Sequence, residues 1–302
     1  MRILIGILHT IENEFPQCIE AIKNQTYQNF DYFVVENIPN KEAHDTLYRR
    51  FMDSADNYEL FIKVDADMVL SRTTFFEEVA TKMKENTATD DLEIAVHDFF
   101  TDRLIYGLHV FRNTMTWDTE NNESIFVDRT GQQKVHVHDD KELAPAAFHC
   151  PNPSPFQSFH FGLHKATKVM QIDNPRLYAP ASAFHWSNIQ ELLNNYYKTE
   201  KPILRYAILG AYWAIKHKAT SKEVNYNSEK SSKAYQYISQ LNELRFNQVF
   251  SKAIHFFSYR RKNLLYEWII FRSKWTEMSR IKRFIYFIFK HLLFNPKQCM
   301  PL

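Results

Sequence analysis

The feature that most constrains this chain is an apolar run at residues 61–70 that carries two carboxylates, Asp65 and Asp67, one residue apart. Alternate residues of a strand point to the same side. If the strand ends near Val64, both carboxylates lie where the chain leaves the sheet and can share one divalent cation. Mg²⁺ and Mn²⁺ prefer such oxygen ligands together with substrate phosphates. The alternative is a polar turn after a buried strand, which so short a motif does not exclude.

The segments before this motif predict a parallel sheet. Strand-like apolar runs alternate with amphipathic, helix-like segments in the order 2–8, 14–25, 32–35, 41–53 and 60–64. A β-α-β-α-β order implies parallel strands with right-handed crossovers, and ligands bind beyond the carboxyl ends of such strands. Polar residues follow all three predicted strands, with Thr10 after the first and Glu36 after the second. We therefore expect a ligand site at this edge of the sheet.

Residues 15–37 resemble the opening of the family 2 glycosyltransferases of GT-A fold. In that family a helix leads into an N-Q-T-Y-x-x-F turn, present here at residues 24–30, and then into an apolar strand with an acidic end, here Glu36. Asp65-Ala66-Asp67 falls where the family has its DxD motif, and the likeness covers about residues 2–80. The chain departs from the family at residues 36–39, where Glu-Asn-Ile-Pro replaces an Asp-Asp-Gly-Ser-like string.

The resemblance implies an α/β fold of GT-A type, a Rossmann-like, mostly parallel central sheet flanked by helices. It places a nucleotide-sugar-binding catalytic domain at residues 1–190, followed by a helical, basic C-terminal region at 191–302. The implied activity is metal-dependent, inverting hexosyl transfer from a nucleotide-diphosphate sugar, with UDP-sugars favoured. The acceptor implied is an oligosaccharide or lipid-linked glycan of a bacterial surface polysaccharide.

The resemblance also implies roles for individual residues. Thr10, Glu12, Glu36 and Asp65 would contact the nucleotide-sugar. Asp67 and Asp65 would hold Mn²⁺ or Mg²⁺, which stabilises the charge of the leaving diphosphate. GT-A enzymes often take a third metal ligand from a later histidine. In this chain the candidates are His149 and, as an alternative, His185.

The string at residues 135–143, VHVHDDKEL, allows three interpretations. It resembles the family's acid pair, which implies that Asp140 deprotonates the acceptor with Asp139 as its neighbour; Asp98 and Asp102 are rivals. Clustered carboxylates raise one another's pKa, which suits a base. His136 and His138 share one face of a strand and could bind zinc, but no further ligands follow at a fixed spacing. The third interpretation is a solvated strand end.

Composition and cysteine spacing limit the classes of protein that fit this sequence. Cys18, Cys150 and Cys299 are far apart and odd in number, which predicts reduced thiols rather than a disulfide framework or a zinc set. The five glycines form no phosphate-binding motif. The sequence shows no signal peptide and no apolar run of the roughly 18 to 20 residues that a membrane span needs. We expect a cytoplasmic protein without a nucleic-acid partner.

The last third predicts helices at 160–171, 188–218 and 229–256, and an amphipathic helix at 281–293. Residues 251–302 carry eleven Lys and Arg against two Glu, whereas the rest of the chain has a net charge of about −7. A basic amphipathic helix is typical of a membrane interface, and packing on the protein itself is the alternative. We expect peripheral association with anionic membrane at the inner face of the cytoplasmic membrane.

Two other functions fit parts of the sequence. A nucleotidyltransferase of α/β fold can carry paired Asp residues, but it needs basic residues near its first loop, which here contains Glu12 and Glu14. A non-catalytic scaffold that binds glycan or membrane would keep the fold without turnover. Hydrolysis of nucleotide-sugars in the presence of Mn²⁺ distinguishes these classes from a glycosyltransferase.

The tail yields the first prediction. The double substitution Phe284→Asp with Ile288→Asp places charge on the apolar face of the 281–293 segment. It should release the protein from anionic liposomes in co-sedimentation, and so should added salt, since each Lys or Arg near the surface contributes about 1 kcal/mol. Wild-type protein that stays in the supernatant at low salt contradicts membrane association.

Overall fold

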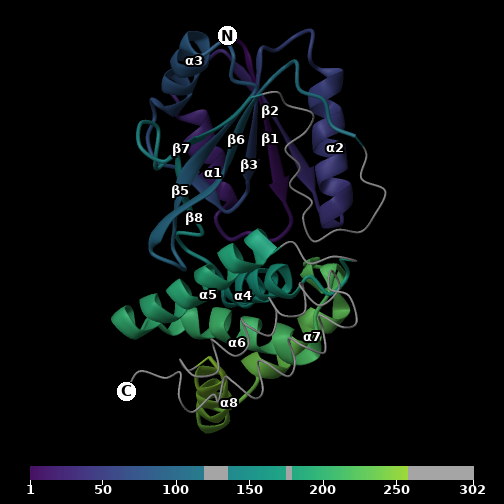
Figure 1. Ribbon diagram of the computed structural model, residues 1–302, viewed down its shortest axis with the longest axis vertical. Coiled ribbons are helices and arrows are strands. Elements are labelled where there is room, and N and C mark those ends of the chain that lie inside the picture. The colour runs from purple at the N-terminus through teal and green to yellow at the C-terminus, as the bar shows by residue number, and fades with distance from the viewer. Residues whose placement is uncertain (119–134, 175–178, 258–302) are drawn as a thin grey trace, which may run out of the picture.

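The structure, a computed structural model, describes residues 1–118, 135–174 and 179–257. A sheet carries helices on both faces, and a group of further helices lies beyond the ends of its strands (Figure 1). The strands are β1 (Ile3–His9), β2 (Phe30–Glu36), β3 (Leu60–Asp65), β4 (Met68–Leu70), β5 (Asp91–Asp98), β6 (Arg103–Arg112), β7 (His136–Asp139) and β8 (Ala147–His149). The helices are α1 (Phe15–Lys23), α2 (Asn40–Asp53), α3 (Phe75–Glu85), α4 (Pro155–Met170), α5 (Ala179–Thr199), α6 (Pro202–His217), the 3₁₀ turn η1 (Ser221–Val224), α7 (Glu229–Ser239) and α8 (Glu243–Phe256).

The sheet has the strand order β2-β1-β3-β6-β5-β8-β4, and β7 also pairs with β5. β1 runs parallel to β2 and β3, whereas β6 is antiparallel to both β3 and β5. The parallel registers place His9 beside Glu36 and Leu8 beside Asp65. The predicted β-α-β-α-β unit and its common polar edge are therefore confirmed. So is the fold class, a Rossmann-like α/β sheet flanked by helices with a helical region after it.

Successive side chains of β1 point to opposite faces of the sheet and pack against the helices that cover each face. Ile3, Ile5 and Ile7 are fully buried in a cluster with residues of α1 and α3, whereas Leu4 belongs to a cluster with α2. Each such side chain contributes about 1.5–3 kcal/mol by leaving water. Gly6 faces α2, and a Cβ there would lie 2.8 Å from the Phe51 ring, so only glycine lets α2 pack this close to the strand.

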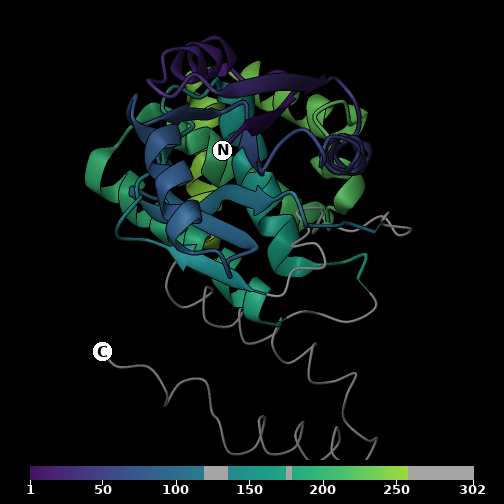
Figure 2. The ribbon, with the colours of Figure 1, turned by 90° about the horizontal axis from the view of Figure 1, so that it is seen from above.

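The helices beyond the sheet are held by a close backbone crossing of α4 and α6. A Cβ at Gly162 would lie 1.7 Å from the carbonyl oxygen of Ala207, and one at Gly210 would lie 1.9 Å from that of Phe159. No side chain fits at either position, so the two backbones touch. When the molecule is viewed from above, the strands lie over these helices (Figure 2). The crossing fixes α4, the helix that faces the strand ends.

Helix boundaries differ from the prediction for local reasons. α4 begins at Pro155, before the predicted residue 160, because the Ser154 hydroxyl accepts from the Gln157 amide N–H while the Gln157 side chain accepts from the Ser154 N–H. The predicted helix at 188–218 is two helices separated at Glu200, whose φ of 51° is left-handed.

Two predictions about the C-terminal part of the chain are not tested by the described helices and strands. The predicted tail helix at 281–293 lies outside the described residues, and the domain boundary at 190 stays a prediction. Within residues 1–118, 135–174 and 179–257, no helix has the length and apolar character needed to cross a membrane.

Candidate active site

A cavity of about 610 Å³ lies where the ends of the first strands face α4, α5 and η1. This volume is typical of ligand sites, which span roughly 300–1,000 Å³. Six of the residues predicted from the sequence line this cavity: Thr10, Glu12, Asp65, Asp67, His149 and His185. The opposite wall is largely basic or imidazole, with His160, His164, Lys165 and Lys168 on α4. A carboxylate-rich wall thus faces a wall of lysines and histidines.

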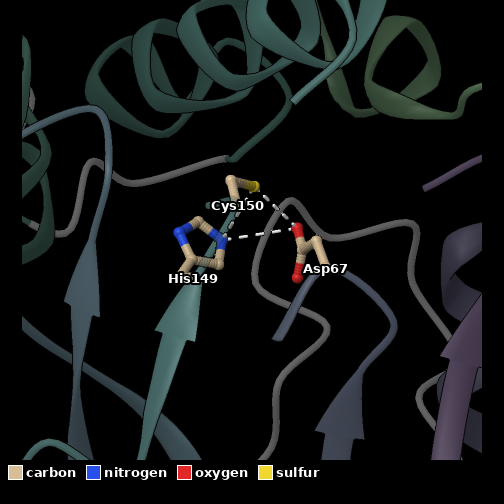
Figure 3. A group of neighbouring side chains, drawn as sticks. All are labelled: Asp67, His149 and Cys150. Atoms are coloured by element: carbon tan, nitrogen blue, oxygen red, sulfur yellow. Dashed lines mark hydrogen bonds and ion pairs between the residues drawn. The ribbon is translucent and has the colours of Figure 1, made fainter. Parts of the chain in front are cut away.

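Asp67, His149 and Cys150 meet at the end of β8 (Figure 3). The antiparallel pairing of β4 with β8 places Met68 opposite His149, so the turn before β4 carries Asp67 to that strand end. Asp67 Oδ2 lies 3.2 Å from Cys150 Sγ and 3.4 Å from His149 Nε2. The Cys150 backbone N–H also donates to the Asp67 carbonyl at 2.8 Å. Strand pairing therefore builds a donor cluster around the second Asp of the motif.

His149 is oriented by a buried carboxylate. Its Nδ1 lies 2.6 Å from Asp98 Oδ1, and Asp98 Oδ2 accepts from the N–H and the hydroxyl of Thr101 at 2.7 and 2.6 Å. Burial alone would raise the pKa of Asp98, but His149 and Thr101 hold it below its ordinary value. Burial likewise opposes a charged His149, yet the carboxylates of Asp67 and Asp98 raise the pKa of His149 well above its ordinary value. Asp98 thereby directs Nε2 of His149 towards Asp67.

The cluster fits a divalent cation. Asp67 Oδ1 is buried with no hydrogen-bond partner among the described residues, and leaving such an acceptor unpaired costs about 1–3 kcal/mol. The carboxylate of Asp67 is the type of ligand that Mn²⁺ and Mg²⁺ prefer, and the hydrogen bond from His149 to Asp98 is the usual outer support of a metal-binding histidine. Burial and the charge of Asp67 raise the pKa of the Cys150 thiol well above its ordinary value, so Cys150 stays a thiol that donates to Asp67.

Glu12 and Asp65 add negative charge to the same wall. Glu12 Oε2 accepts from the N–H groups of Thr10 and Ile11 at 2.6 and 3.1 Å, and the side chain is 10% exposed. Burial, with the nearby charges of Asp67 and Asp65, raises the pKa of Glu12 to about 7. Asp65 pairs with Nζ of the buried Lys63 at 3.0 Å. The wall thus concentrates carboxylates with few compensating cations, which favours a bound cation.

A buried network that the sequence did not reveal connects the first loop to α4. Glu14 is fully buried and accepts from Gln157 Nε2 at 2.8 Å and from the Asn152 N–H at 3.0 Å. Gln157 Oε1 in turn accepts from the Asn13 N–H at 2.9 Å. The residues are 138 to 144 positions apart, so no local pattern indicates the contact. The network holds the loop that carries Glu12.

The predicted nucleotide contact Glu36 does not line the cavity, although the residues on either side of it, Val35 and Asn37, do. The Glu36 side chain is 50% exposed and lies 3.4 Å from His9 Nδ1. The next residue, Asn37, lines the cavity and has a left-handed φ of 58°. Such a conformation suits Asn, and the sequence signal for this position is its place directly after the second predicted strand.

The predicted acid pair lies outside the cavity. Asp139 Oδ1 accepts from the backbone N–H groups of residues 141, 142 and 143, and Oδ2 lies 2.9 Å from Lys82 Nζ. Burial alone would raise the pKa of Asp139, but Lys82 and these N–H groups hold it below its ordinary value. Asp140 is exposed, and burial together with the nearby charge of Asp140 raises the pKa of the hydroxyl of Tyr106, a cavity residue. Asp102, one rival, pairs with Lys198 at the surface.

Comparisons with known proteins add little to this geometry. No protein-family model matches the sequence, and no curated protein matches it. Among solved structures, S. aureus TarS 1-349 matches with 12% identity over 74% of this chain and 83% of that chain, at a TM-score of 0.36. A197 from STIV matches with 16% identity over 37% of this chain and 65% of its own length, at a TM-score of 0.30. Both TM-scores are too low to carry an inference about activity.

The pKa of Glu12 yields a prediction about stability. Because the folded-state pKa is raised from 4.5 to about 7, the contribution of Glu12 to stability is complete below pH 4.5 and is lost as the pH rises through 7. The stability of wild-type protein relative to Glu12→Gln should fall by up to about 3 kcal/mol between these pH values. Urea unfolding from pH 4 to 8 measures this. Glu20→Gln, at an exposed position of α1, controls for the loss of one charge; parallel curves for Glu12→Gln and wild type would contradict the raised pKa.

Proposed function

We propose that this protein is a metal-dependent glycosyltransferase that moves a sugar from a nucleotide-diphosphate sugar, with UDP-sugars favoured, to a glycan acceptor. One observation carries the proposal: the buried, unpartnered Oδ1 of Asp67 lies at the strand edge of the cavity, beside an imidazole that Asp98 orients. This is the arrangement that a cation-bound diphosphate requires. The likeness of residues 2–80 to GT-A glycosyltransferases supports the same activity.

In this proposal Asp67 and His149, with Asp65 nearby, would hold Mn²⁺ or Mg²⁺. The cation supplies charge that stabilises the departing nucleoside diphosphate. Lys165, on the facing wall, offers a further positive charge for phosphate oxygens. Thr10 and Asn37, also in the wall, would contact the nucleoside, and Glu36, which does not line the cavity, would reach it only from beside Asn37.

The inverting reaction that we propose needs a base for the acceptor hydroxyl. Asp140 keeps this role in the proposal because the family resemblance implies it. Glu12 is the alternative, since its pKa of about 7 suits a proton acceptor near neutral pH. An oligosaccharide or lipid-linked acceptor of surface-polysaccharide biosynthesis, at the cytoplasmic membrane, is proposed from the resemblance and the basic tail alone.

The metal ligand gives the decisive test. The full chain is assayed for hydrolysis and transfer with a panel of nucleotide-sugars and Mn²⁺. Asp67→Asn should reduce turnover by at least roughly 100-fold, as should EDTA, because the cation's contribution to charge stabilisation is lost. Asp56→Asn, an exposed change of the same type, should retain activity. Full activity of Asp67→Asn, or of wild type in EDTA, contradicts the proposal.

The base is tested by pairing Asp140→Asn with Glu12→Gln. Asp140→Asn should lower kcat by roughly 100-fold or more and leave the KM for the donor unchanged, because shape is kept while basicity is lost. If Glu12→Gln shows this pattern instead, Glu12 is the base. Product stereochemistry by NMR provides an independent check, since retention of the anomeric configuration would reject the inverting mechanism.

A further inference from the structure

A second group of metal-type side chains lies on β5 and β7, and of its members only Glu93 lines the cavity that contains Asp67. β7 lies beside β5 in the sheet (Figure 1). The two strands are parallel, with His136 opposite Asp91 and His138 opposite Glu93. Residues two apart on a strand share a face, so Asp91, Glu93 and both histidines lie on the same side of the sheet. The pairing supplies the third ligand that the sequence did not show next to the two histidines.

The donor atoms of this group converge on one point. His138 Nε2 lies 3.0 Å from Glu93 Oε2, His136 Nε2 lies 3.4 Å from the same oxygen, and the two Nε2 atoms are 3.0 Å apart. Tetrahedral coordination with bonds of about 2.0–2.1 Å separates neighbouring ligand atoms by roughly 3.3 Å. The observed triangle therefore has the size that one zinc-sized ion requires.

Buried partners already orient two of the three ligands. Asp91, which is fully buried, lies 2.7 Å from His136 Nδ1 and accepts a hydrogen bond from it. That bond places the proton on Nδ1 and leaves a lone pair on Nε2, directed at Glu93 and His138. His109 Nε2 lies 3.5 Å from Glu93 Oε1 and thereby leaves Oε2 for the histidine pair. A carboxylate behind a ligand histidine is the usual outer support of a zinc site.

We propose that Glu93, His136 and His138 bind a divalent transition-metal ion of the Zn²⁺ class. Two imidazoles and one carboxylate suit Zn²⁺ and disfavour Mg²⁺ and Ca²⁺, which take oxygen ligands. Three protein ligands leave a fourth position open. The ion would join the short strand β7 to β5 just before Asp139, whose carboxylate organises the following turn. The site shares no ligand with the Asp67 cluster, although Glu93 also lines the cavity.

The test separates this site from the Asp67 cluster. Full-length protein carrying Asp67→Asn is stripped of metal, and Zn²⁺ binding is measured by competition with a chromophoric chelator. Co²⁺ spectra of the same protein report the ligands. We expect one Zn²⁺ per chain and a tetrahedral Co²⁺ spectrum without a thiolate charge-transfer band, because no cysteine belongs to this group.

Adding His138→Gln should weaken Zn²⁺ binding by on the order of 100-fold or more, since loss of an outer partner alone costs 10- to 100-fold. His138 is 51% exposed, so its replacement leaves the core intact. His97→Gln is the matched control: it lies on β5, is 40% exposed and belongs to neither cluster. No Zn²⁺ site in the Asp67→Asn protein, or equal affinity after His138→Gln, overturns the proposal.

Discussion

The structure depends most on one buried contact, the bond between Asp98 at the end of β5 and Nδ1 of His149 at the end of β8. Asp98 is fully buried, and its second oxygen is satisfied by Thr101. An unpaired carboxylate in that place would cost several kcal/mol, so the imidazole cannot turn away without penalty. With Nδ1 held, Nε2 can only face Asp67. A contact outside the cavity thereby decides the geometry within it.

The same strand organises both candidate metal sites. β7 and β8 pair with successive stretches of one edge of β5, so Asp91 and Glu93 meet the histidines of β7 while Asp98 meets His149. In both places a buried Asp on β5 supports a histidine from a neighbouring strand. β5 thus supplies the supporting carboxylate behind two groups of donor atoms, and Glu93 of the second group also lines the cavity.

Sequence reasoning succeeded where the signal is local. The β-α-β-α-β order and the position of Asp65 and Asp67 at a strand end follow from short-range periodicity, and parallel pairing then brings the strand ends together. It failed where strands far apart in the chain pair. Asp98 and His149 are 51 residues apart, and Glu93 is likewise far along the chain from His138. Hydrophobic periodicity does not indicate which of these distant strands pair. For that reason the sequence offered His136 and His138 without a further zinc ligand. The roles proposed for Asp139 and Asp140 rest on the family resemblance alone.

The charge balance of the cavity explains why a cation and a phosphate would bind there together. Glu12, Asp65 and Asp67 lie along one wall, and Lys63 is committed to Asp65. Burial, and then the neighbouring charges of Asp67 and Asp65, raise the pKa of Glu12 to about 7, so a further negative charge on this wall is unfavourable. A divalent cation at Asp67 relieves that repulsion, and it leaves local positive charge facing the lysines of α4. An anionic ligand such as a diphosphate, bound between the two, neutralises both walls at once. In the proposed function, binding of either partner would therefore strengthen binding of the other.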